Sequence, residues 1–400
     1  MRSSHKAGRT ALLGFTIAAV LATACAGDTT EDPTATGAPE TTGTEVEAQT
    51  LRVGVIAPLT GPAAAIGVPA VDAAQAVVDA RNAEGGHQIE LVVRDTKTDP
   101  TEAARVATEL IESENVPVLL GPIIGSAALA MAPIAEEAGV PFLTASATPG
   151  VVDETASWFP YVFGLTLDDT VFAPSLIERI AGDGAETIAI FHQEDAYGEF
   201  GNEQFSAAAE DQGLEVIESR SAPLDAQDVS AQAQSIAAAQ PDAVIVQVNN
   251  VELATNFVVA AGQAGLEPGQ MYGSTGLAQQ AFLDSAGEAA EGMKLVAWVR
   301  TDEPTAAQQE LWAMIEAAGK TPTMSFIDLL LSSGINVLYD VMDRTTDLSS
   351  AGIIAALNQT TDVPSFFNAT YVFTEEDHRG LSPDAAMPVI AQGGVFVLDE

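Results

Sequence analysis

Residues 51–57 read Leu-Arg-Val-Gly-Val-Ile-Ala, an apolar run with one charge, and residues 58–62 continue the chain as Pro-Leu-Thr-Gly-Pro. A short apolar run that ends in a Gly/Pro turn is typical of a strand buried on both faces. Apolar residues then recur at helical spacing over 71–83, and Gly85 and Gly86 mark the end of that helix. A buried strand followed by a helix is the repeating unit of parallel sheets, so this stretch predicts an α/β fold.

The strand–helix unit recurs along the rest of the chain. After the first unit we predict strands at 89–93, 117–120 and 141–145 and helices at 101–114 and 127–138. In a second set we predict strands at 187–191, 215–218, 243–248, 270–273 and 293–299 and helices at 171–181, 202–212, 229–239 and 252–264. This alternation indicates parallel sheets with right-handed crossovers. The sequence therefore predicts two doubly wound parallel-sheet lobes.

The division of the chain between these lobes follows from its last third. Further helices predicted at 326–344 and 348–358 come after the second set of strands, which indicates that the chain returns to the first lobe. We predict lobe 1 at 51–165 and 300–384, and lobe 2 at 166–299 and 385–400. A chain of 400 residues that is 47% apolar is long enough for two cores of this kind.

The first 25 residues read as a secretion signal. A basic start is followed by a charge-free apolar run at 11–22, which is too short to span a bilayer and is typical of a signal peptide. The stretch Leu-Ala-Thr-Ala-Cys at 21–25 resembles a bacterial lipobox, in which the cysteine is lipidated. We therefore predict a signal peptide at 1–24 and lipidation at Cys25. The alternative is an ordinary secretory signal cleaved after Ala24, with Cys25 incidental.

Residues 25–50 carry small, polar and acidic residues with almost no large apolar side chain. Such a segment cannot bury enough apolar surface to fold alone, so we interpret it as a disordered tether. The tether and the lipid together predict an extracytoplasmic protein held by lipid at the outer face of the cell membrane.

The composition excludes several classes of function. With 15 Lys and Arg against 56 Asp and Glu, the net charge is −41, which repels phosphate backbones, so no nucleic-acid partner is expected. A single cysteine and scattered histidines leave no metal-ligand spacing. The glycines of 121–125 lack the lysine of a phosphate-binding loop, and Ser126 and Ser146 lack a nucleophile elbow. We therefore predict a protein that is not an enzyme and has no cofactor or metal.

Polar turns follow three of the predicted first-lobe strands, at 58–62, 121–126 and 144–149. In open parallel sheets, ligands bind beyond the carboxyl ends of the strands, where helix N-termini present unpaired N–H groups. The hydroxyls in these turns suit an anionic or strongly polar group such as a carboxylate. The alternative is that the hydroxyls only cap helices, and Ser126 is a candidate N-cap.

A series of short motifs extends from about residue 51 to the C-terminus. They are VGVIAPLTGP at 53–62, NAEGG at 82–86, 95–100, Thr148-Pro149, DAYG at 195–198, AAEGM at 289–293 and FTEEDHRGL at 373–381. Their order and spacing resemble the type I periplasmic binding proteins of the leucine/isoleucine/valine-binding kind. These are the extracytoplasmic receptors of branched-chain-amino-acid ABC importers.

The resemblance implies two lobes that close over a small ligand, joined by three hinge crossings. We place the crossings near 165–169, 297–301 and 385–388. The family binds the ligand carboxylate with hydroxyl and backbone N–H groups of the first lobe and covers the ligand with a second-lobe tyrosine. By resemblance, the ligand-binding residues of the first lobe and that tyrosine are Gly125, Ser126, Ser146, Ala147, Thr148 and Tyr197.

The match to amino-acid binders is weaker at three positions. The family's acid that neutralises the ligand ammonium is absent, since Thr275 lies in its place, and a family aromatic is replaced by Ile66. The next second-lobe loop supplies Asn249, Asn250 and Glu252 in place of tyrosines. We include Asn250 and Thr275 among the predicted ligand-binding residues. Glu252 or Asp195 takes over the ammonium, or both are solvated charges.

These observations predict a substrate-binding lipoprotein of an ABC importer. It is expected to act as a monomer and to capture a branched-chain or related amino acid, or another small carboxylate or amide. Its expected partners are that ligand, the lipid anchor and the ABC permease subunits in the membrane. The alternative is a ligand-sensing lipoprotein that signals to a membrane kinase.

Overall fold

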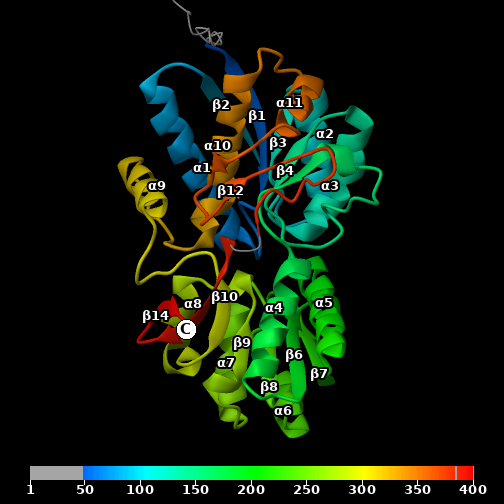
Figure 1. Ribbon diagram of the computed structural model, residues 1–400, viewed down its shortest axis with the longest axis vertical. Helices are drawn as coiled ribbons and strands as arrows, with labels where there is room; N and C mark the ends of the chain where they lie inside the picture. The colour runs from blue at the N-terminus through cyan, green and yellow to red at the C-terminus, as the bar shows by residue number, and fades with distance from the viewer. Residues whose placement is uncertain (1–47, 383–384, 400) are drawn as a thin grey trace, which may run out of the picture. The chain divides into compact units, whose positions relative to one another are not determined.

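The computed structural model describes residues 48–382 and 385–399 (Figure 1). The predicted signal peptide, the lipidation at Cys25 and nearly all of the predicted tether lie outside the described residues. Within the described part of the chain, none of the helices has the length and apolar character needed to cross a membrane.

The first sheet is wholly parallel and has the order β2-β1-β3-β4-β5. Its strands are β1 (Thr50–Ala57), β2 (Gln88–Asp95), β3 (Val118–Leu120), β4 (Phe142–Thr144) and β5 (Val162–Gly164). Register is set around β1, where Val53 pairs with Leu91 on β2 and with Val118 on β3. All carboxyl ends therefore meet at one edge of the sheet.

Helices cover both faces of this sheet (Figure 1). On one face Val53 and Val55 pack in a cluster with α1 (Ala64–Glu84) and α10 (Phe326–Arg344). On the other face Ile56 packs in a cluster with α2 (Pro100–Glu112) and α3 (Gly125–Ala138). Side chains alternate between the faces of a strand, and this alternation explains why β1 carries apolar side chains on both faces.

The chain returns to the first sheet after the second one. Helix α10 packs along α1, α9 (Ala306–Ala317) also contacts α1, and α11 (Ser350–Leu357) contacts α10. A two-stranded ribbon of β11 (Val363–Pro364) and β12 (Thr370–Tyr371) follows. We call the first sheet with these segments the first lobe.

The second sheet has the order β14-β13-β10-β9-β8-β6-β7. Its strands are β6 (Thr187–Gln193), β7 (Glu215–Ala222), β8 (Ala243–Gln247), β9 (Met271–Gly273), β10 (Lys294–Ala297), β13 (Met387–Gln392) and β14 (Val395–Leu398). The part from β7 to β10 is parallel and repeats the strand order of the first sheet. Strand β13 is antiparallel to β10, and β14 is antiparallel to β13.

Helices also cover both faces of the second sheet, and we call the whole the second lobe. Ile188 and Ile190 pack toward α4 (Asp169–Gly182) and α5 (Ala196–Gln212). Ala189 and Phe191 pack toward α6 (Ser230–Ala239), α7 (Val251–Gln263) and α8 (Gln280–Ala286). Short 3-10 turns complete the described structure: η1 (Phe159–Tyr161), η2 (Pro268–Gln270), η3 (Thr275–Leu277) and η4 (Gly287–Ala290).

The chain passes between the sheets three times: between β5 and α4, between β10 and α9, and ahead of β13 (Figure 1). The first crossing is buried, and Leu165 accepts a hydrogen bond from the Tyr371 hydroxyl through its carbonyl oxygen at 2.8 Å. The predicted α/β class with two doubly wound lobes is confirmed.

The second sheet is not wholly parallel, because β13 and β14, which were not predicted, add an antiparallel edge. Strand β5 and helices α8 and α9 were not predicted. Helix α1 begins at Ala64 rather than Val71, and α5 begins at Ala196 rather than at residue 202. Gly67 lies inside α1, although glycine disfavours helices. A Cβ atom at this position would overlap the Pro58 carbonyl oxygen, so the close packing of α1 against Pro58 explains the glycine.

Candidate functional site

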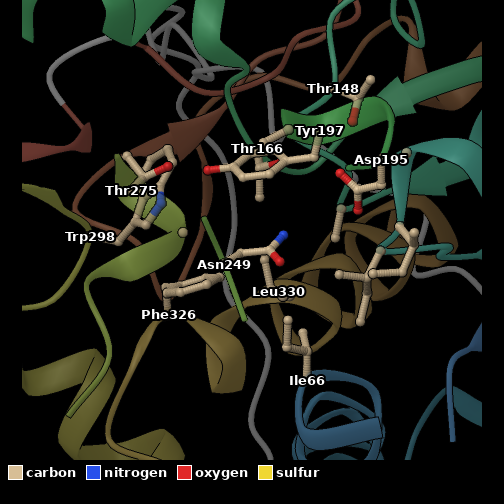
Figure 2. A pocket seen from close by; sticks show the side chains of 16 residues that line it. Ile66, Thr148, Thr166, Asp195, Tyr197, Asn249, Thr275, Trp298, Phe326 and Leu330 are labelled. Carbon is tan, nitrogen blue, oxygen red and sulfur yellow. The ribbon is translucent and has the colours of Figure 1, made fainter. Parts of the chain in front are cut away.

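A cavity lies where the carboxyl ends of strands from both sheets face each other (Figure 2). It encloses about 550 Å³ of empty space, including the part that opens to solvent. The segments after β3, β4 and β5 contribute from the first lobe, and those after β6, β8 and β9 contribute from the second. This is the location that open parallel sheets favour for ligands.

The turn after β4 directs one hydroxyl group toward the cavity. Thr144 donates through Oγ1 to the Pro122 carbonyl oxygen at 2.9 Å, and Ser146 accepts through Oγ from the Thr148 backbone N–H at 3.2 Å. The Thr148 side chain lines the cavity, and its buried Oγ1 has no hydrogen-bond partner in the described structure. Buried polar groups are nearly always paired, so the unpaired Thr148 Oγ1 is a candidate to hydrogen-bond a ligand atom.

A second unpartnered hydroxyl belongs to Thr166, which lies two residues after the end of β5. Its Oγ1 is buried, and the residue lines the same cavity (Figure 2). Thr166 was not predicted, because the three-residue strand before it was not recognised. Its place just beyond the carboxyl end of a strand is the signal that a correct assignment of β5 supplies.

The N-terminus of α3 lies at the same corner of the cavity. The helix begins at Gly125, and its N-cap residue is Ile124, whose side chain makes no capping hydrogen bond. Ser126 is therefore the second residue of the helix, and its prediction as N-cap is wrong. Because no side chain caps this end, the first-turn N–H groups and the helix dipole remain available to an anion. Gly125 itself lines the cavity.

On the opposite wall, Tyr197 is buried and contributes its ring (Figure 2). Its hydroxyl lies 2.8 Å from the Ser274 Oγ, so the tyrosine is tied to the neighbouring second-lobe loop. Burial raises the pKa of Tyr197, which keeps the phenol neutral. Thr275 and Gly276 continue this wall, and a Cβ atom on Gly276 would lie 2.7 Å from the Tyr197 hydroxyl oxygen.

Asp195 is the only charged residue among those that line this cavity. Its position is set by two hydrogen bonds: Oδ1 accepts from the Gly198 backbone N–H at 3.0 Å as the N-cap of α5, and Oδ2 accepts from the Gln193 Nε2 at 2.8 Å. Gln193 is in turn held by the Asn249 backbone N–H, which donates to its Oε1 at 2.9 Å. The carboxylate is therefore fixed before any ligand arrives.

The remaining wall is apolar. Trp298 is 2% exposed and packs edge-on against Phe172 and Phe367. Phe326 and Leu330 from the start of α10 also line the cavity. No local sequence signal points to these residues, because they reach the cavity through the crossing after β10 and through the packing of α10 on α1.

Of the predicted ligand-binding residues, five line the cavity: Gly125, Ala147, Thr148, Tyr197 and Thr275. Ser126, Ser146 and Asn250 do not. Ser146 holds the turn through the Thr148 N–H, and Asn250 is the N-cap of α7, where its Oδ1 accepts from the Leu253 N–H at 2.9 Å. Asn250 lines an adjoining cavity instead.

No histidine of the described residues lines this cavity. His378 is buried, stacks between Phe159 and Phe163, and donates or accepts through ring nitrogens with partners in the first lobe. Its pKa is lowered by burial. Among residues 48–382 and 385–399, no group of histidine and acidic side chains is arranged to hold a metal ion.

Residues 50–394 match a protein family described as periplasmic binding protein. The chain is 24% identical over 326 residues to "Leu/Ile/Val-binding protein homolog 7" of Brucella abortus, a match that covers 77% of this chain and 80% of that one. It is 26% identical over 318 residues to the "Leucine-, isoleucine-, valine-, threonine-, and alanine-binding protein" of Pseudomonas aeruginosa, covering 78% and 83%.

Solved structures share the fold. An extracellular ligand-binding receptor from Rhodopseudomonas palustris HaA2 is similar with a TM-score of 0.78 at 24% identity, covering 88% of this chain and 100% of that chain. A branched-chain amino acid transporter substrate binding protein from Streptococcus pneumoniae, solved in complex with isoleucine, is similar with a TM-score of 0.70 at 21% identity, covering 88% and 100%.

Proposed function

Because the chain belongs to the periplasmic binding protein family, we propose that it captures a small amino-acid-like ligand between its two lobes and delivers it to an ABC importer. Proteins of this family bind substrates outside the cytoplasm and are not enzymes. The observation that carries the proposal is the unpartnered, buried Thr148 hydroxyl beside the uncapped N-terminus of α3.

The ligand carboxylate is assigned to this corner of the first lobe. Thr148 and Thr166 offer two buried hydroxyl donors without partners, and the N-terminus of α3 adds backbone N–H groups with a positive dipole end. Hydrogen bonds to a charged oxygen contribute about 1.5–3 kcal/mol each, which is more than neutral bonds contribute. A carboxylate has two oxygens that accept hydrogen bonds at about four positions, which suits a site with several donors.

The ligand ammonium is assigned to Asp195. Thr275 occupies the wall where an acid was expected by resemblance, and the cavity lining holds no other charged residue. The two hydrogen bonds to Asp195 leave lone pairs on both carboxylate oxygens, so a cation can still bind them. Glu252 does not line this cavity, which supports Asp195 rather than Glu252 as the partner of the ammonium.

Lipidation of Cys25 completes the proposal. A diacylglyceryl cysteine at the new N-terminus, followed by the polar segment 25–50, keeps the binding lobes at the outer face of the membrane, near the permease. The support for this part is the sequence alone, in the basic start, the apolar run and the lipobox-like stretch.

Calorimetry of the full-length protein with single amino acids tests the ligand assignment. Thr148→Val should lower the affinity roughly tenfold to a hundredfold without lowering stability, since it removes a hydroxyl that has no protein partner. Asp195→Asn should weaken an amino acid much more than its deaminated analogue. The matched control is Thr361→Val, which changes an exposed threonine of the first lobe. Unchanged affinity in Thr148→Val would remove the site assignment.

A further inference from the structure

A second cavity adjoins the first one. Both are lined by Ile66, Ile124, Asp195 and Asn249, so the two spaces meet at these residues. The second space encloses about 940 Å³, including the part open to solvent, and lies between the β1–α1 turn and the first turns of α7. We call it the second compartment. Figure 2 labels Ile66, Asp195 and Asn249 among the side chains that line the first cavity.

The second compartment holds polar groups that the protein itself leaves unpaired. Glu252 is exposed and makes no ion pair or hydrogen bond with any described residue. The Thr255 Oγ1 is buried and has no partner in the described structure. The side-chain amide of Asn249 likewise bonds to no described group, although its backbone is held by Gln193 and Gln279.

The charges of this compartment have one sign. Its lining contains two acids, Asp195 and Glu252, and no lysine, arginine or histidine. The whole chain carries a net charge of −41, which adds to the negative potential in a cleft. A cation is therefore electrostatically stabilised in the second compartment, whereas an anion is repelled.

The boundary between the two spaces is apolar on its first-lobe side. Ile66 comes from the start of α1, Ile124 precedes α3, and both border each cavity, as Asp195 does from the second lobe. A ligand that occupies both spaces thus meets hydroxyl donors at one end, two isoleucine side chains and Asp195 in the middle, and a second acid at the other end. An aliphatic chain between two polar groups matches this order.

We propose that the second compartment binds a positively charged group at the far end of an extended amino acid, with Glu252 as its counter-ion. The proposal rests on the proposed function for the head group, in which Thr148 receives the carboxylate and Asp195 the α-ammonium. The preferred ligand class is then a basic amino acid with an aliphatic stem, in which two cations meet two acids.

Lysine and norleucine are a matched pair for the test, because they share the head group and the four-carbon stem and differ only in the terminal ammonium. Calorimetry of the full-length protein with each should show lysine binding at least roughly tenfold more tightly, as expected for one charge-assisted contact. Leucine is the third probe and reports on the head-group site alone.

Glu252→Gln should reduce the ratio of lysine to norleucine affinity toward one and leave norleucine binding unchanged. Thr255→Val should reduce the same ratio by a smaller factor. The control is Glu210→Gln on α5, which makes the same charge change at an exposed position outside both cavities and should preserve the ratio.

Two outcomes overturn the inference, and they are separable. If leucine or norleucine binds as tightly as lysine, or if Glu252→Gln preserves the ratio, the second compartment does not select a cation, while the head-group assignment stands. If none of the three amino acids binds, the proposed function for the head-group site fails, and this inference fails with it.

Discussion

The side chain of Thr148 lies against the α-carbon of Gly125, where a Cβ atom would overlap the threonine hydroxyl. The two residues are held there by different segments, the turn after β4 and the start of α3. Their contact brings an unpartnered hydroxyl and an uncapped helix N-terminus to one point. One carboxylate can therefore reach both.

Gly125→Ala should lower ligand affinity roughly tenfold or more while the fold persists. The added methyl must displace Thr148, whose β-branched side chain has few alternative rotamers, and loss of a bond to a charged group costs about 1.5–3 kcal/mol. Calorimetry of the variant measures the loss. Gly262→Ala is the control, because a Cβ atom there meets open space on α7. Equal affinity in Gly125→Ala and Gly262→Ala would contradict the role of this corner.

Tyr197→Phe and Ser274→Ala should each lower the free energy of unfolding by about 1 kcal/mol, the net value of a buried hydrogen bond. Because the two hydroxyls bond each other, the double variant should cost clearly less than the two single changes added together. Chemical denaturation of the four proteins measures the coupling. Strict additivity would show that the 2.8 Å contact does not contribute to stability.

The buried carboxyl of Asp169 should make the free energy of unfolding depend on pH. Its side chain is fully buried beside Gln247, whose Nε2 donates to Asp169 Oδ2 at 2.7 Å, while Asp169 Oδ1 and Gln247 Oε1 have no partner among the described residues. Burial raises the pKa of Asp169 well above its ordinary value of 3.8, and the negative charge of Asp168 raises it further by a smaller amount. The stability that this group contributes is thus complete below about pH 3.8 and is lost as the pH rises through the raised pKa.

Wild type should therefore lose stability as the pH rises from 4 to 7, whereas Asp169→Asn should not. The free energy of unfolding of the variant should rise relative to that of wild type by on the order of 1–3 kcal/mol over this range. The introduced amide can also donate to the unpartnered Gln247 Oε1. Thermal unfolding at several pH values measures the difference. Asp225→Asn, at an exposed loop position, should show no such trend. A constant difference between Asp169→Asn and wild type across this range would contradict a neutral Asp169.

Ligand binding should compact the protein through bending at the three crossings between the sheets. Three connecting segments restrict the motion to a hinge, since sliding would stretch at least one of them. Small-angle X-ray scattering should give a smaller radius of gyration with a saturating amino acid that calorimetry shows to bind. Thr148→Val at the same concentration of that amino acid should compact less. Identical radii with and without bound ligand would rule out closure.

Cys25→Ser should release the protein from membranes. Acyl chains contribute about 0.8 kcal/mol per buried CH₂, so a diacylglyceryl group holds a body that one chain would not hold. Labelled fatty acid should enter the wild-type protein and not the variant, and fractionation should move the variant out of the membrane pellet. Equal labelling of both proteins would exclude Cys25 as the modified residue.

Much of the site was open to prediction because the sequence shows where strands end. Thr148 and Asp195 each follow a recognisable strand, and both line the cavity. The hydrogen bonds that follow were not predictable. Ser146 resembles Thr148 in the sequence, yet its hydroxyl oxygen holds the turn, while the Thr148 hydroxyl is left free.

The sequence by itself determined the α/β fold and the two-lobe plan, because apolar runs and helical spacing are local properties of consecutive residues. It did not determine which residues meet. Thr166, Asp195 and Phe326 lie apart in the chain and converge only because the carboxyl ends of the strands of the two sheets face each other and α10 returns to pack on α1. The tertiary structure alone therefore decided that Asp195 borders both cavities whereas Glu252 lines only the second, since the register and packing that place them are long-range.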